Sequence, residues 1–143
     1  MILYIDTSAL VKRYINETGS VEVSRLFDLA ELVGTVVLAR VEMAAALTRA
    51  VRQKWIEATD AESAWQDFGE HWLSFTRLTV TLALVDRASR LAWEHGLRGY
   101  DAMHLSAALI WRESLDTPVT LATYDRDLWR AAQNSGLTVW PEG

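Results

Sequence analysis

The sequence contains no cysteine, which excludes disulfide bonds and thiolate metal sites. It has only two prolines, Pro118 and Pro141, so long helices can run uninterrupted through the first part of the chain. No stretch approaches the roughly 20 apolar residues of a membrane-spanning helix. The apolar start ends at Asp6, too early for a signal peptide. We therefore expect a soluble, cytoplasmic protein without disulfides and with no membrane association.

Basic residues are scarce and nearly all of them are arginine, since the only lysines are Lys12 and Lys54. The 143 residues carry a formal net charge of -5; half are hydrophobic and 23% are charged. This composition is typical of a folded globular protein, and the length predicts a single domain, residues 1–143. The negative charge counts mildly against a nucleic-acid partner. A site that binds divalent cations, however, must itself be acidic.

Short apolar runs alternate with helical patterns along the chain. Strands are expected at 2–5, 34–38, 78–80, 119–123 and 137–140, and helices at 8–15, 21–32, 39–54, 59–75, 84–95, 101–114 and 127–134. In the second helix we expect Val21, Leu26 and Leu29 to face inward. The alternation predicts an α/β fold: a three-layer α/β/α sandwich with a mostly parallel sheet of four or five strands.

Local signals mark several helix ends. The run from Thr59 to Glu62 has the spacing of a capping box, which predicts a helix start there. Gly96 and Gly136 are expected to end helices. His95 lies just before Gly96, at the expected C-terminus of a helix. The partial negative charge of a helix C-terminus favours a histidine at this position.

Acidic residues fall where a parallel sheet gathers its strand ends. Asp6 follows the first strand, Glu42 lies on the helix after the second, and Asp101 opens a later helix. Asp125 follows the fourth strand, with Asp127 as a rival for the same role. The ligand crevice of an open α/β sheet lies beyond the carboxyl ends of its strands. Crowded carboxylates there favour a hard divalent cation that neutralises them and activates water.

Each acid also has an ordinary interpretation. Asp6, Asp101 and Asp125 can be helix N-caps. Glu42 has apolar neighbours one turn away, and a buried lone carboxylate is costly unless it is paired, protonated or bound to metal. Its ordinary interpretation is that the small alanines leave it in water near the start of the helix, where the helix dipole favours an acid. His104, three residues after Asp101, can touch the site, but a packed or surface histidine is the interpretation we favour.

Four blocks in order carry a family resemblance: YIDTSALVK at 4–12, VEMAAAL at 41–47, YDAMHLSAA at 100–108 and LATYDRDL at 121–128, the last followed by GLTV at 136–139. Together they resemble the PIN-domain ribonucleases, and within them the VapC-type toxins of toxin–antitoxin modules. The resemblance covers essentially the whole chain. It implies an endoribonuclease that depends on Mg²⁺ or Mn²⁺. In this resemblance Asp6, Glu42, Asp101 and Asp125 match the acidic catalytic and metal-binding positions, and Ser8 and Thr123 match polar positions that support them.

The resemblance also implies partners: an RNA substrate, a small antitoxin whose segment lies in an apolar groove, and a second copy in a homodimer. Trp65, Phe68, Trp72 and Phe75 recur at three- and four-residue steps and form an aromatic stripe. A core-facing stripe is the favoured interpretation. The alternative hypothesis is that part of it lines the antitoxin or dimer groove.

Two other classes compete with a ribonuclease. A catalytically inactive PIN-like binding module predicts acids dispersed as helix caps or paired with arginine. A receiver domain or an aspartate-nucleophile phosphatase is disfavoured, because no lysine follows Lys54 and Ser8 stands where the phosphatase needs a second aspartate.

Overall fold

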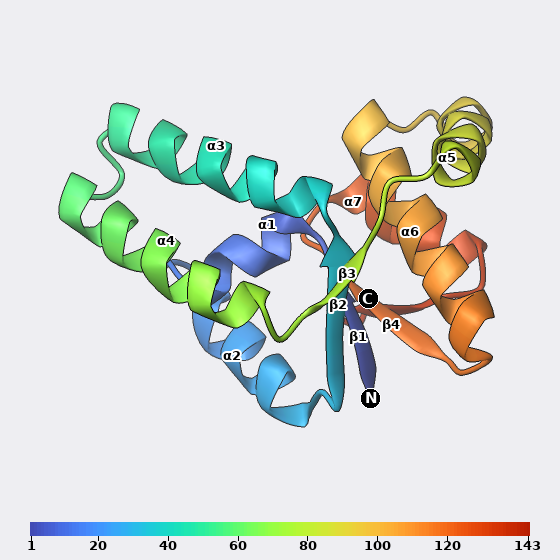
Figure 1. The fold of residues 1–143 in the computed structure, drawn as a ribbon, viewed down its shortest axis with the longest axis horizontal. Coiled ribbons are helices and arrows are strands. Elements are labelled where there is room, and N and C mark those ends of the chain that lie inside the picture. Colours follow the sequence, from blue (N-terminus) through green and yellow to red (C-terminus); the bar gives the residue numbers. More distant parts are fainter.

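The computed structural model describes residues 1–143 and contains one sheet of five parallel strands in the order β3-β2-β1-β4-β5 (Figure 1). The elements follow the chain as β1 (Ile2–Ile5), α1 (Thr7–Leu10), η1 (Val11–Arg13), α2 (Ser20–Leu29), β2 (Leu32–Val36), α3 (Leu38–Arg52), α4 (Ala58–Trp72), β3 (Thr76–Leu78), α5 (Leu82–His95), α6 (Gly99–Leu115), β4 (Val119–Ala122), α7 (Arg126–Asn134) and β5 (Thr138–Trp140). The predicted α/β fold is confirmed. No helix is both long enough and apolar enough to cross a membrane.

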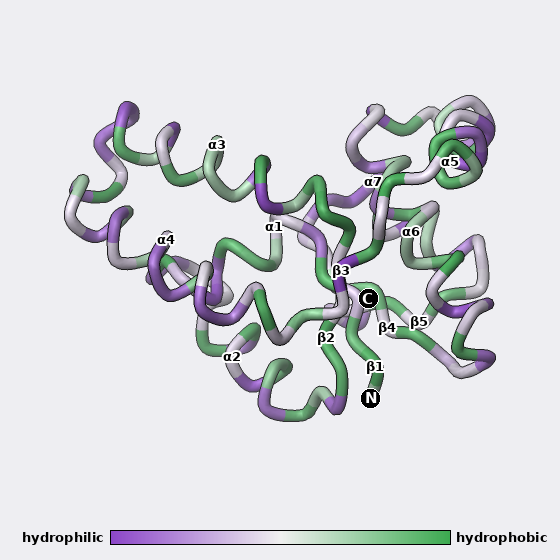
Figure 2. Tube along the Cα trace, viewed as in Figure 1, coloured by the Kyte–Doolittle hydropathy of each residue, from purple (hydrophilic) through white to green (hydrophobic).

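Helices cover both faces of the sheet because its central strand is apolar on both sides. In β1, Tyr4 belongs to the core formed with α5, α6 and α7, whereas Leu3 and Ile5 belong to the core formed with α1 to α4. This alternation is the two-residue period of a strand. Figure 2 shows β1, β2 and β4 as mostly hydrophobic, as expected for a parallel sheet buried on both faces.

The strand order places a crevice beside β1. The chain leaves β1 toward β2 through helices on one face, and it reaches β4 from β3 through helices on the other face. The order of the strands therefore reverses between β1 and β4, which pair in register from Ile2 with Val119 to Ile5 with Ala122. Such a switch point is where open α/β sheets bind ligands.

The structure corrects several predicted boundaries. Strand β2 begins and ends two residues earlier than expected, and so does β3. Helix α2 stops at Leu29 rather than continuing to residue 32. Within α2 the inward residues are Val23 and Leu26, whereas Val21 and Leu29 are exposed, so the predicted inward set was right only for Leu26.

Helix ends were predicted with mixed success. Gly96 adopts a left-handed conformation at the end of α5, as a C-terminal glycine should. Gly136 also has positive φ, but it follows Ser135, the residue that caps α7. The expected capping box at Thr59 is wrong, because α4 begins at Ala58 and its cap position, Glu57, makes no side-chain capping bond.

The aromatic stripe on α4 and just beyond it is mainly core. Phe68, Trp72 and Phe75 are buried against β1, α2 and α3, which supports the core interpretation for these three residues. Trp65 alone is partly exposed, and it lines a groove of about 400 Å³ with Leu47 of α3. The interface hypothesis is therefore restricted to Trp65.

Candidate active site

The four predicted acids line one cavity of about 280 Å³ at the carboxyl ends of β1, β2 and β4. Asp6 directly follows β1, and Glu42 lies in the second turn of α3, the helix after β2. Asp101 lies in the first turn of α6, and Asp125 precedes α7. The cavity walls are almost entirely polar and consist of Asp6, Thr7, Ser8, Glu42, Arg98, Tyr100, Asp101, His104 and Asp125.

Asp6 is the most buried of these acids, at 3% exposed, and both of its oxygens accept hydrogen bonds. The Ser8 hydroxyl donates to Oδ1 at 2.8 Å and the Ala9 backbone N–H donates to it at 3.1 Å, while Thr123 donates to Oδ2 at 2.7 Å. Asp6 is thus the N-cap of α1 and also a wall of the cavity. Ser8 and Thr123 support it, as the resemblance implies. Burial raises the pKa of Asp6, although His104, Thr123 and Ser8 oppose the shift.

Glu42 is half-buried and paired rather than left in water. Its Oε1 accepts from Thr7 at 2.9 Å and lies 2.6 Å from Nε2 of His104. Burial alone would raise the Glu42 pKa, but the hydrogen bond and charge of His104 outweigh it, so the pKa is lowered. His104 is itself buried and lines the cavity, so it is both packed and part of the site.

Asp101 and Asp125 share one cation, Arg98. The Arg98 Nε donates to Asp101 Oδ2 at 3.1 Å, and Nη2 donates to Asp125 Oδ2. Burial and the charge of Asp125 raise the pKa of Asp101, while Arg98 opposes the shift. Asp125 is also the N-cap of α7, because its Oδ1 accepts from the Leu128 N–H. Arg98, and not Asp101, occupies the cap position of α6.

The rival acid lies outside the cavity. Asp127 is exposed in the first turn of α7 and does not line the site. Sequence reasoning did not find Arg98 or Thr7, and it underrated His104. The available signals were a basic residue three positions before Asp101 and a hydroxyl beside Asp6, both of which are common at helix starts.

The carboxylates are held by protein donors. As the side chains lie, no three Asp, Glu or His groups form a ready-made metal-binding set. Arg98 holds Asp101 and Asp125, while His104 holds Glu42. The donor set nevertheless fits a hard divalent cation, because it consists of carboxylate oxygens, including the buried Asp6, whose ionised form a cation would stabilise.

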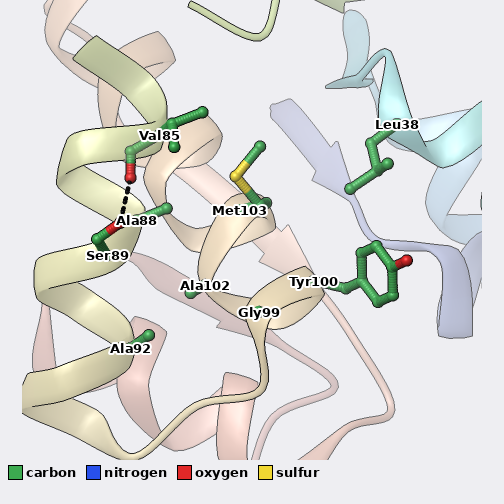
Figure 3. A pocket seen from close by; sticks show the side chains of 9 residues that line it. All are labelled: Leu38, Val85, Ala88, Ser89, Ala92, Gly99, Tyr100, Ala102 and Met103. Carbon is green, nitrogen blue, oxygen red and sulfur yellow. Dashed lines mark hydrogen bonds between the residues drawn. The ribbon is translucent and has the colours of Figure 1, made fainter. Parts of the chain in front are cut away.

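A second cavity of about 440 Å³ adjoins the acidic one and is mainly apolar. Figure 3 shows it between α5 and α6, with the Tyr100 ring pointing toward Leu38 at the side of α3. Tyr100 is 62% exposed and lines both cavities. An extended ligand at the acids would therefore also meet an aromatic side chain and an apolar wall.

Comparison with known proteins assigns the family, because the PIN domain signature matches residues 3–134. The chain belongs to the PIN-domain family. Within that family it is of the VapC type: it is 36% identical to Ribonuclease VapC45 of Mycobacterium tuberculosis over 143 residues, covering 98% of this chain and 95% of the relative. The predicted resemblance is confirmed, and the receiver and phosphatase hypotheses are wrong.

Solved structures of other proteins share the fold of this chain. The crystal structure of PAE2754 from Pyrobaculum aerophilum has a TM-score of 0.66 at 23% identity and covers 97% of this chain and 90% of its own. A toxin–antitoxin complex from Klebsiella pneumoniae has a TM-score of 0.63 at 16% identity over 89% of each chain. At these identities the likeness shows the fold alone.

Proposed function

We propose that this PIN-domain protein is a metal-dependent endoribonuclease, the toxin of a type II toxin–antitoxin module, with Asp6, Glu42, Asp101 and Asp125 as its catalytic and metal-binding residues. The observation that carries the proposal is the convergence of these acids from four separate elements on one cavity at the switch point of the sheet. The inactive-module alternative predicts dispersed acids. Asp6 and Asp125 are caps, and Asp101 and Asp125 pair with Arg98, but all four acids line the same cavity.

The acids would hold Mg²⁺ or Mn²⁺ at the cavity. Such an ion supplies a water of lowered pKa and positive charge for the phosphodiester under attack. Asp6 is fixed by three donors and defines one side of the site, while Glu42 is fixed by two donors on a single oxygen. Arg98 lies at the rim and is 78% exposed in its side chain, so it can turn from the acids toward a phosphate.

RNA and an antitoxin are the proposed partners. The exposed ring of Tyr100 beside the acids offers a face on which an unpaired base can stack. The relative named as a ribonuclease and the Klebsiella toxin–antitoxin complex support these two partners. A homodimer in the cytoplasm is part of the same proposal, supported by the family resemblance.

Replacing a metal ligand tests the site directly. We expect Asp6→Asn and Asp101→Asn each to lower Mg²⁺-dependent cleavage of single-stranded RNA by more than about 100-fold, since loss of outer-shell partners alone typically costs about 10- to 100-fold. Initial rates with a labelled oligonucleotide, together with the unfolding temperature of each variant, measure this effect.

Asp127→Asn is the matched control, because it removes a nearby carboxylate that is exposed and outside the cavity. It should cleave at the wild-type rate. Unchanged cleavage by folded Asp6→Asn and Asp101→Asn would contradict the assigned residues. Absence of cleavage by the wild type with either metal would favour the inactive binding module.

A further inference from the structure

Two donors bond the same oxygen of Glu42. Thr7 Oγ1 donates to Oε1 at 2.9 Å, and His104 Nε2 lies 2.6 Å from that same oxygen. An ionised carboxylate only accepts hydrogen bonds, so Nε2 carries a hydrogen whatever the charge of the ring. The other oxygen of Glu42, Oε2, has no hydrogen-bond partner within the chain. The carboxylate is thus fixed through one oxygen and keeps the second one available.

His104 is anchored in the core on its far side. Its Nδ1 lies 2.8 Å from the Tyr4 hydroxyl, and the oxygen of that hydroxyl accepts from the Val36 backbone N–H at 3.2 Å. Tyr4 is 0% exposed and His104 is 1% exposed, and their rings pack edge to face. A hydrogen-bonded chain therefore runs from the backbone of β2 through two buried rings to Glu42. Because leaving any of its buried groups unpaired is costly, the chain has one favoured arrangement.

We propose that the Tyr4–His104–Glu42 chain is a positioning device for the metal site, in which His104 never touches the ion but holds Glu42 with Oε2 available as a ligand. The inference rests on the proposed function, since Glu42 must be a metal ligand. His104 and Asp101 stand three residues apart on α6, so one helix would supply a ligand and also the support of a second ligand. Histidine does this better than a hydroxyl because its ring spans the distance from the core to Glu42.

Two substitutions distinguish the roles of the two ring nitrogens of His104. In His104→Gln the side-chain amide can occupy the position of Nε2 and donate to Glu42. In His104→Asn the amide can occupy only the position of Nδ1, so the variant keeps a partner for Tyr4 but leaves Glu42 with Thr7 as its single donor. Calorimetric titration with Mn²⁺ measures ion affinity without any RNA, and cleavage of a single-stranded RNA oligonucleotide is measured in parallel.

We expect His104→Asn to weaken Mn²⁺ binding by about 10- to 100-fold, the usual cost of losing an outer-shell partner. His104→Gln should restore affinity to within a few-fold of wild type. His71→Asn is the control, because it makes the same substitution in another tyrosine–histidine pair, Tyr14 with Nδ1 of His71 at 2.9 Å, outside the site. Its affinity should equal that of wild type. If His104→Asn does not fold, Tyr4→Phe removes the anchor while keeping the packed ring, and it should also weaken binding.

Other results would overturn the inference. Wild-type affinity in folded His104→Asn would mean that Glu42 needs no positioning. Equal losses in both His104 variants, together with nitrogen coupling to Mn²⁺ in the wild-type electron paramagnetic resonance spectrum, would make His104 a ligand itself. A wild type that binds Mn²⁺ without cleaving RNA contradicts the ribonuclease but leaves the affinity comparison decisive. A wild type that binds no divalent ion overturns both proposals.

Discussion

At the scale of single residues, Arg98 stands where a metal ion is proposed to act. Its guanidinium bonds Asp101 and Asp125 at once, although it lies on the rim and is largely exposed. A divalent ion that takes these carboxylates must displace Arg98 or share them with it. The arginine therefore offsets the repulsion between the two acids and also competes with the ion.

Removing Arg98 should tighten ion binding. In Arg98→Ala the two acids lose their shared counter-charge, so we expect Mn²⁺ affinity to rise several-fold at low ionic strength and the gain to shrink as salt screens the site. Calorimetric titration at two salt concentrations checks this. Arg87→Ala is the control, since it removes an ion pair between Arg87 of α5 and Glu113 of α6, neither of which lines the acidic cavity. Weaker binding in Arg98→Ala would mean that the guanidinium organises the acids rather than competing for them.

The residues of the site were predictable to different degrees. Asp6, Glu42, Asp101 and Asp125 could be named because acids at strand ends and helix starts converge in a parallel sheet, and the structure does bring all four to one cavity. The role of His104 was not predictable, since its partner Tyr4 is 100 residues away and only the packing of β1 against α6 brings them together.

At the scale of elements, the contact between β2 and α6 limits which residues the sheet accepts. A Cβ added to Gly34 would lie 2.6 Å from the Trp111 ring, and that ring is itself buried. The ring cannot move without opening the core, so glycine here is required by packing rather than by a special backbone angle. The same contact helps fix α6, which carries both Asp101 and His104.

Two glycine substitutions distinguish packing from helix propensity. Gly34→Ala should destabilise the protein by about 1–3 kcal/mol, the usual cost of overpacking a core. Gly69→Ala lies within α4, where a Cβ meets nothing within 4 Å, and it should stabilise by about 0.4–1 kcal/mol. Urea unfolding of both variants and wild type measures these free energies. A stable Gly34→Ala protein would show that α6 can shift away from the sheet.

Element types were easier to predict than their limits. All the expected strands and all but one of the expected helices exist, because the apolar runs and helical periods are strong. The helix expected at 8–15 is instead the short helix α1, followed by the 3-10 turn η1 that ends at Arg13. The second strand was placed two residues late because the run of Thr35, Val36 and Val37 reads as strand, whereas the sheet pairing ends at Val36 and α3 begins at Leu38. In α2, packing against the rest of the fold buries Val23 and Leu26. The sequence of this helix has apolar residues on several faces, so it does not reveal which of them are buried.

At the scale of the whole molecule, the site costs the protein stability that a cation would restore. Burial is the main cause of the raised pKa values of Asp6 and Asp101, so the ionised forms of these two acids are less favourable in the folded chain than in the unfolded chain. A raised acid pKa means that these two groups stabilise the fold least when both are ionised, and that their contribution improves as pH falls through the folded pKa. A bound cation reverses this balance because it stabilises the ionised forms.

That residues 1–143 form one domain remains a prediction.

Divalent cations should therefore stabilise the protein in a pH-dependent manner. At a free Mn²⁺ concentration about 100 times the dissociation constant, we expect about 2.7 kcal/mol of added stability, seen as a rise of several degrees in the unfolding temperature. The rise should shrink as the pH falls toward the raised pKa values of Asp6 and Asp101, because ion binding must then release the protons that these two groups take up. Asp101→Asn should lose most of the rise, whereas Asp127→Asn should keep it. A rise that does not change with pH would mean that the ion binds away from these two carboxyls.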